Sequence, residues 1–263
     1  MLRALLASLG IGLLTSMAGF FVIYRRLAFA GQGIAHAIFG GVALAFALGF
    51  SPLLGGAAFA IAIAVAIAAI SRHGSLSEDA AIGIFFSAAM ALGTVLVART
   101  PGYVDLFGYL FGNILAVTPA DLWTLVVAGG LTLAFFVHYF HDLVAVAFSP
   151  ELAQVDGKPV AFLEYGLLIA IAAVVVLAVR MVGIVLVSAL LVIPPATARL
   201  RARHYPAFLA LTLALNLTSS LGGLLLSYWF DLPSGGTIVL LATTLFLAAF
   251  ARQHLTFRRH TRT

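Results

Sequence analysis

Nine long stretches of this chain contain almost no charged side chain, and they constrain its fold more than any other feature. A helix needs about 20 apolar residues to cross the roughly 30 Å hydrocarbon layer of a membrane. Several of the stretches are short for this, so we predict an all-α polytopic bundle of about eight or nine transmembrane helices. The stretches cover residues 4–24, 34–50, 53–70, 80–98, 122–140, 160–179, 181–196, 207–229 and 236–251.

The composition supports a membrane protein. Of the 263 residues, 63% are hydrophobic and only 9% are charged, against about 25% charged in a typical soluble domain. Lipid must cover most of this apolar surface, which excludes a soluble enzyme, and the formal charge of +5 indicates membrane topology rather than nucleic-acid binding. The absence of cysteine excludes disulfides and thiolate metal sites. No linker is visible, so residues 1–263 are predicted to form a single transmembrane domain.

The distribution of the 14 lysine and arginine residues predicts the orientation of the bundle. With the N-terminus outside, eleven of them fall on the cytoplasmic side and three outside, as the positive-inside rule requires. The C-terminal tail is then cytoplasmic, where it suits a basic anchor at the anionic leaflet. The three outer cations are Arg3, Arg99 and Arg180.

The chain lacks the residues that a self-powered transporter needs. Its single lysine, Lys158, does not stand in a phosphate-binding P-loop pattern, so the chain does not hydrolyse ATP itself. Nearly all charged residues fall at span ends or in loops, whereas ion-coupled carriers place ionisable residues inside their spans. We therefore expect a partner protein that supplies the energy.

Residues 149–157 read as a short helix outside the membrane on the cytoplasmic side. Ser149 is a good N-cap, Pro150 suits the first helical position, and Glu151 suits the positive end of the helix dipole. Gly157 is a typical C-terminal stop, and a proline two residues later prevents continuation. So short a helix is not stable alone in water, so it must pack either on its own bundle or on another protein such as a cytoplasmic ATPase.

Five stretches of the chain together resemble the membrane permease subunit of ABC importers for zinc, manganese or iron. The resemblance spans almost the whole chain. Each stretch alone is weak evidence, because short apolar sequences recur by chance, but their order along the chain makes the resemblance specific. They are residues 31–43 (GQGIAHAIFGGVA), 78–84 (EDAAIGI), 109–115 (YLFGNIL), 149–153 (SPELA) with Gly157, and the joined pair 182–198 (VGIVLVSALLVIPPATA) and 227–238 (SYWFDLPSGGTI).

The resemblance implies a multi-pass protein of the bacterial cytoplasmic (inner) membrane, assembled as a homodimer around a central pathway. It implies two partner proteins, a cytoplasmic ATP-binding subunit and an extracytoplasmic metal-binding protein. The permease itself would be no enzyme and would hold no stable cofactor, since it moves a divalent zinc, manganese or iron ion by alternating access. The coupling helix on which the ATPase acts would contain Ser149, Pro150, Glu151, Ala153 and Gly157.

His36, near the inner end of the second predicted span, and Gln32 are the candidate metal residues. The family commonly has an aspartate four residues before this histidine, and residues at i and i+4 share a helix face, so both can contact a passing cation. Gln32 departs from that pattern and offers a neutral, weaker carbonyl ligand. His36 is either a hydrogen-bonded packing residue or a transient ligand, the latter because ionisable groups at membrane depth tend to be functional.

Pro194 and Pro195 remove two backbone donors near the end of the seventh predicted span, so they must kink or end that helix. Broken helices in transporters are tolerated where the backbone lines a cavity, which makes Ser188 to Thr197 a candidate pathway wall. Simple termination of the helix is the alternative.

His138, His141 and Asp142 have a spacing that can chelate zinc from one helix face. They lie where the fifth predicted span meets the cytoplasm, and the resemblance gives them no role. We therefore interpret them as interfacial residues.

Three other functions are considered on the sequence. A permease for iron-chelate or cobalamin-type cargo shares the general architecture and would have a wider, less polar pathway. A stand-alone secondary transporter would need buried acidic residues, which the predicted spans lack. A structural membrane scaffold is disfavoured by the specific signals of residues 149–157.

Overall fold

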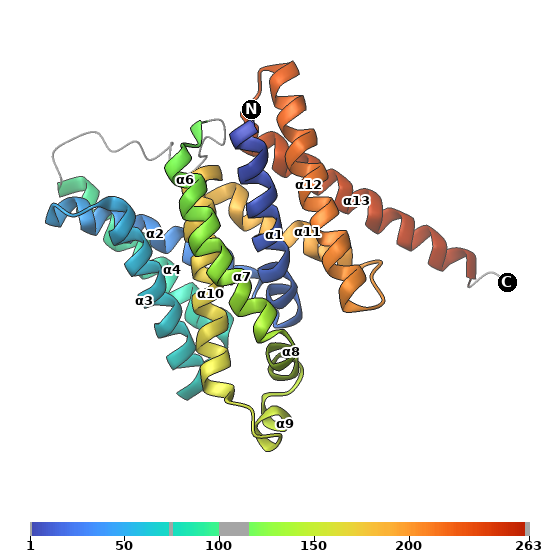
Figure 1. Cartoon of the computed structure of the whole chain (residues 1–263), viewed down its shortest axis with the longest axis horizontal. Helices are drawn as coiled ribbons and strands as arrows, with labels where there is room; N and C mark the ends of the chain where they lie inside the picture. Colours follow the sequence, from blue (N-terminus) through green and yellow to red (C-terminus); the bar gives the residue numbers. More distant parts are fainter. Residues whose placement is uncertain (1, 74–75, 100–115, 261–263) are drawn as a thin grey trace.

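The computed structural model describes residues 2–73, 76–99 and 116–260 of the chain, so the stretch 109–115 lies outside the described residues. The described part is built from helices, which Figure 1 labels in chain order. They are α1 (Leu2–Tyr24), α2 (Ala28–Leu48), α3 (Pro52–His73), α4 (Glu78–Arg99), α6 (Pro119–Thr124), the π-helix η2 (Leu125–Gly129), α7 (Gly130–His138), α8 (Phe140–Phe148), α9 (Pro150–Val155), α10 (Val160–Val182), α11 (Ile184–Arg199), α12 (Tyr205–Phe230) and α13 (Ser234–His260).

Eight helical segments of the described part are long and apolar enough to cross a membrane, with α6, η2 and α7 together forming the fifth. The seventh predicted stretch, residues 181–196, becomes α11, which has only 16 residues and is about 24 Å long at 1.5 Å per residue. The predicted all-α bundle of about eight or nine spans is therefore confirmed. In Figure 1 the N-terminus and α9 lie at opposite ends of the bundle.

The second span begins earlier than the apolar stretch predicted. Helix α2 starts at Ala28, whereas the apolar stretch starts at residue 34. The two differ because the polar Gln32 interrupts the hydrophobic sequence but does not interrupt the helix. The capping carbonyl of Leu27 accepts a hydrogen bond from the N–H of Ala30 at 2.9 Å, which opens the first turn. Gln32 and His36 consequently share one continuous helix.

Helix α11 continues through both prolines to Arg199, so the interpretation of Pro194 and Pro195 as a simple helix end is wrong. Gly19 of α1 lets the two helices approach so closely that a Cβ atom there would collide with Cγ of Pro195 and lie 2.9 Å from the carbonyl oxygen of Leu191. The packing of α1 against α11 thus holds the segment in place.

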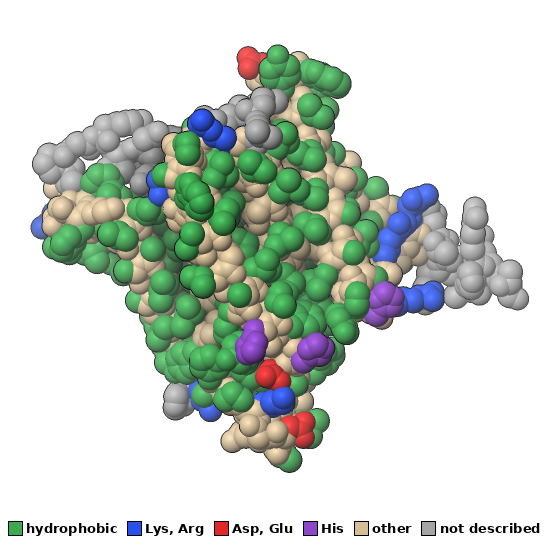
Figure 2. Space-filling model, in the orientation of Figure 1, with side chains coloured by type: hydrophobic (Ala, Val, Ile, Leu, Met, Phe, Trp, Pro, Cys, Tyr) green, Lys and Arg blue, Asp and Glu red, His purple; other side chains and the backbone are tan. Residues whose placement is uncertain are grey.

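The bundle has a tightly packed centre and an apolar outer surface. Helix α2 packs against α3, α4 and α11, while α1 packs against α11 and α12, and α12 packs against α13. Apolar side chains cover much of the lateral face in Figure 2, and histidine, acidic and basic side chains gather near the end that carries α8 and α9. This distribution is typical of a membrane-embedded bundle with polar ends.

Small polar residues join α1 to α12 inside the bundle. Asn216 of α12 is fully buried, and its Nδ2 donates to the hydroxyl oxygen of Ser16 in α1 at 2.9 Å. The Ser16 hydroxyl in turn donates to the carbonyl oxygen of Gly12 at 2.6 Å. Such interhelical hydrogen bonds hold helices together in lipid, where no hydrophobic force acts between them.

Candidate coupling helix and metal pathway

Helix α9 is specified at both ends by hydrogen bonds that its own sequence provides. At the start, the Ser149 hydroxyl accepts a hydrogen bond from a first-turn backbone N–H at 3.3 Å. At the end, the N–H of Lys158 donates to the carbonyl of Ala153 at 3.0 Å and the N–H of Gly157 donates to that of Gln154 at 3.1 Å. Gly157 has φ +74°, so this is a complete Schellman motif with glycine at the left-handed position. The predicted short helix is present.

The surface of α9 faces away from the bundle. Leu152 is 67% exposed and Val155 is 84% exposed, and the neighbouring Glu151 is exposed as well. Only Ala153, at 1% exposure, is buried against the rest of the chain. Within this chain the helix is therefore held mainly by its caps and one small side chain, which leaves two large apolar side chains uncovered.

An ion pair fixes the segment that follows α9. The Lys158 ammonium donates to Oδ1 of Asp142 in α8 at 2.5 Å. This hydrogen bond, together with the negative charge of Asp142, raises the pKa of Lys158 above its usual value. The link between α9 and α10 is thereby tied to α8.

A second set of charges lies where α10 begins. Arg25, in the link between α1 and α2, contacts Glu78 of α4 at 2.8 Å and Glu164 of α10 at 3.7 Å. Arg72 of α3 contacts Glu164 at 3.0 Å. We call Arg25, Arg72, Glu78 and Glu164 the inner ion cluster. Nothing in the sequence indicates that these residues pair, because partners 53 and 92 positions apart give no local pattern.

The side chain of His36 lies partly exposed on α2, with Gln32 exposed one turn earlier. Nδ1 of His36 is 2.8 Å from the backbone carbonyl oxygen of Gln32, and the ring lies edge-on to Phe86 of α4 at 5.1 Å between centroids. A carbonyl oxygen only accepts, so Nδ1 is the donor in this contact, and in the neutral imidazole the lone pair is then on Nε2. This tautomer is the one that binds metal, with its other nitrogen oriented by a carbonyl.

The residues His138, His141 and Asp142, which we interpret as interfacial, lie on two different helices. Helix α7 ends at His138, and Tyr139, with φ −95° and ψ 11°, separates it from α8, which carries His141 and Asp142. Asp142 is already paired with Lys158. Within the described residues there is no group of three or more histidine and acidic side chains that could hold a metal ion.

The predicted pathway wall is only partly accessible in the single chain. Pro194 and Pro195 are buried, whereas Ser188 is half-buried on the same helix. The Ser188 hydroxyl donates to the carbonyl of Ile184 at 2.8 Å, which occupies its proton and leaves the oxygen able to accept. Of the three residues named for the predicted wall, Ser188 is therefore the one with a half-buried polar side chain.

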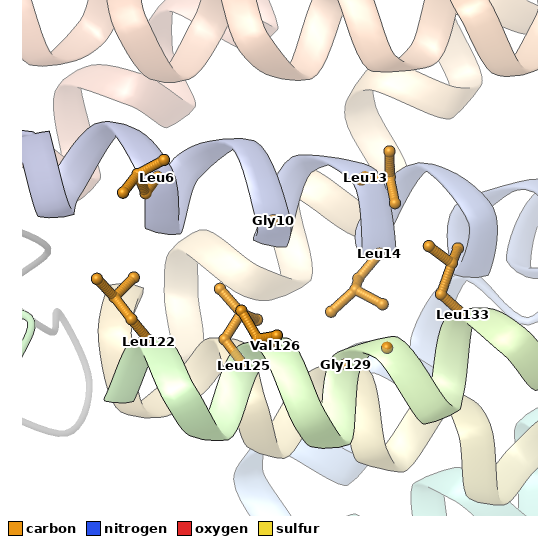
Figure 3. Close-up of a pocket in the computed structure, with 10 residues that line it drawn as sticks. Leu6, Gly10, Leu13, Leu14, Leu122, Leu125, Val126, Gly129 and Leu133 are labelled. Atoms are coloured by element: carbon orange, nitrogen blue, oxygen red, sulfur yellow. The ribbon is translucent and has the colours of Figure 1, made fainter. Parts of the chain in front are cut away.

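An apolar cavity of about 290 Å³ lies between α1 and the fifth span (Figure 3). In the part of the chain that the structure describes, its walls are hydrocarbon and backbone, with no charged or hydroxyl side chain. Such walls cannot replace the hydration shell of a cation. The lining residues are Leu6, Gly10, Leu13, Leu14, Leu122, Leu125, Val126, Gly129, Gly130 and Leu133.

Comparison with known proteins identifies the family. The model of the ABC 3 transport family matches residues 1–253. The chain belongs to the ABC 3 transport family. It is 39% identical over 249 residues to the manganese transport system membrane protein MntC of Halalkalibacterium halodurans, covering 94% of this chain and 85% of that protein. It is 37% identical over 248 residues to the manganese import system permease protein ScaB of Streptococcus gordonii, covering 94% and 89%.

A solved structure is also similar to this ABC 3 family member. A chain of PsaBC from Streptococcus pneumoniae in complex with Fab matches with a TM-score of 0.82 and 35% identity, covering 94% of this chain and 90% of that one. The resemblance to ABC permeases is therefore confirmed. The chain is a multi-pass permease of the bacterial inner membrane, a transport subunit rather than an enzyme, whose family implies ATP-binding and substrate-binding partners.

Proposed function

We propose that this chain is the permease of a manganese importer, and that two copies form a central pathway which alternates between outward and inward access. The observation that carries the proposal is the similarity to manganese permeases over 94% of the chain. The energy comes from a cytoplasmic ATPase, and an extracytoplasmic binding protein delivers the ion. Zinc and iron are the competing cargoes.

The chemistry of α2 supports this cargo. His36 offers an imidazole Nε2 lone pair, and Gln32 offers an amide oxygen on the same face. Imidazole nitrogen suits transition metals and carbonyl oxygen suits Mn²⁺, so the pair matches a borderline-hard ion. A conduit needs ligands weak enough to release the ion, and in the dimer two such pairs share the coordination.

The exposed face of α9 supports the ATPase contact. Leu152 and Val155 lie uncovered on a short capped helix, and a hydrophobic face of this kind fits a groove on a partner. The Lys158–Asp142 pair holds the helix to the bundle, so a push on α9 moves the start of α10.

Transport of Mn²⁺ by purified complexes in proteoliposomes tests the cargo. We expect ATP-dependent uptake of radioactive manganese that excess Zn²⁺ or Fe²⁺ inhibits less than excess Mn²⁺ does. His36→Ala should lower uptake by about tenfold or more while leaving assembly intact, since it removes the strongest ligand. His141→Ala, on the exposed surface of α8, is the matched control and should leave uptake unchanged. Equal uptake by the His36→Ala variant would leave this side chain a packing residue only.

Recovery of the ATPase from native membranes tests the coupling helix. The tagged permease should retain an ATP-binding subunit in mild detergent, and the double variant Glu151→Ala/Gly157→Asp should lose it while remaining inserted and folded. Normal association of the double variant would refute the role of α9. Uptake without any ATPase would instead favour a stand-alone transporter.

A further inference from the structure

The inner ion cluster connects the segment after α9 with the helices around His36. Glu164 lies in the second turn of α10, nine residues after the end of α9. Its carboxylate lies within reach of Arg72 on α3 and Arg25, which itself binds Glu78 at the first position of α4. One acidic side chain of α10 thus bonds, directly or through Arg25, to the ends of α3 and α4.

Helices α2, α3 and α4 behave as one unit because their backbones touch. A Cβ atom at Gly40 of α2 would lie 2.7 Å from the carbonyl oxygen of Ala89 in α4. A Cβ atom at Gly41 would lie 2.7 Å from the carbonyl oxygen of Gly55 in α3. Packed backbones of this kind do not slide independently. A pull on the ends of α3 and α4 therefore reaches α2, which carries His36.

The cluster has space beside it in which its side chains can rearrange. It borders a cavity of about 230 Å³, large enough for several water molecules. Nη1 of Arg25 and Oγ of Ser71 are buried there without a hydrogen-bond partner among the described residues. Since two arginines compete for Glu164 beside this space, hydrated re-pairing within the cluster costs less than breaking a dry ion pair.

We propose that the inner ion cluster transmits the movement of α9 to the α2–α4 unit, with Glu164 as the positioning residue that makes the connection. The cluster acts on the metal only through α2. Loss of the cluster should therefore uncouple ATP hydrolysis from transport, while the ATPase and the extracytoplasmic binding protein still bind. The proposal rests on the proposed function, because it needs an ATPase that moves α9.

The number of ions moved per ATP hydrolysed is the decisive measurement. Permease and ATPase complexes in proteoliposomes are assayed in parallel for manganese uptake and for phosphate release. Glu164→Gln should keep ATPase association and hydrolysis while uptake per ATP falls about three- to tenfold, the range of typical coupling effects. Arg72→Gln, at the more exposed member of the cluster, should give the same direction with a smaller loss.

A second ion pair on the same helix provides the control. Arg180, near the other end of α10, contacts Asp121 of α6 at 2.7 Å, and neither residue touches the α2–α4 unit through an ion pair in the described structure. Arg180→Gln should leave uptake per ATP unchanged. An unaltered ratio in Glu164→Gln and Arg72→Gln, with ATPase bound and active, would overturn the inference alone. Absence of an ATPase from the native complex would overturn the proposed function.

The distance between α10 and α4 provides a second readout, which would not depend on Glu164 if that residue had only a structural role. The chain has no cysteine, so spin labels can be placed at Phe162→Cys in α10 and Ile84→Cys in α4, both exposed. With Glu164 present, the distance between the labels should stay constant when ATP is added, because the two helix ends move together. With Glu164→Gln it should change or broaden on ATP addition. Identical behaviour with and without Glu164 would refute the connection.

Discussion

Helix α9 projects from one end of the bundle with Val155 84% exposed, whereas α2 packs against α3, α4 and α11 with its backbone close to those of α3 and α4. The conformation of α9 is set by its caps, within ten residues of sequence. The position of α2 is set by contacts with helices that are distant in the chain. The proposed contact with the ATPase is thus locally encoded, while the proposed metal contact depends on the whole bundle and on a second copy.

The largest effect should come from breaking the packing of α2. Gly41→Ala places a Cβ atom in collision with Cβ of Phe59 and 2.7 Å from a backbone oxygen of α3. Because backbone cannot yield cheaply, we expect a loss of about 1–3 kcal/mol or more and a lower apparent midpoint of thermal unfolding in detergent.

The matched control is the same substitution in the neighbouring helix α4. A Cβ atom at Gly83 would have no neighbouring atom within 4 Å, so Gly83→Ala meets open space. It should raise stability by about 0.5–1 kcal/mol, because alanine is the better helix former. Equal midpoints for Gly41→Ala and Gly83→Ala would show that α2 is not held by close backbone contact.

A smaller effect should come from straining the end of α9. Gly157 has φ +74°, a conformation that costs about 1 kcal/mol for a residue with a side chain. Gly157→Ala should weaken ATPase association without changing the unfolding midpoint, since α9 is barely packed on the bundle. Gly49→Ala is the control, because Gly49 has φ +73° and open space at the far end of α2. If both variants lose the ATPase equally, α9 is not its specific contact.

A further, modest effect should follow from restoring a carboxylate to α2. Gln32→Asp places a negative charge one turn from His36, so half-saturation by Mn²⁺ should shift to about three- to tenfold lower concentration. The maximal rate should fall as well, because a tighter site releases the ion more slowly. Gln32→Asn keeps the charge neutral and should not tighten binding. A gain that persists in the double variant Gln32→Asp/His36→Ala would show that the two residues do not share the ion.

The difference between α9, which local sequence specifies, and α2, which distant helices hold, explains what could be predicted from the sequence. Ser149, Pro150 and Gly157 specify α9 through local rules, so its existence and both ends are predictable. A hydropathy pattern starts the second span at residue 34 and misses the first turns of α2, because it treats the polar Gln32 as a boundary although the helix continues through it. The inner ion cluster could not be predicted, since it brings together side chains from four segments through tertiary packing alone.

The smallest effect concerns pH, and its sign follows from the Lys158–Asp142 pair. The pKa of Lys158 is raised in the folded protein, so the stabilisation is complete below the usual lysine pKa of 10.5 and is lost only as pH rises through the higher folded value. ATPase association should therefore be constant between about pH 7 and 9 as far as this pair contributes. Lys158→Arg, which stays charged at all these pH values, serves as the control in a pull-down titrated with pH. The contradicting outcome is that ATPase association decreases toward pH 9 in the native protein but not in Lys158→Arg. Lys158 would then lose its proton more easily than a paired ammonium does, and α9 would not be tied to α8 when the ATPase binds.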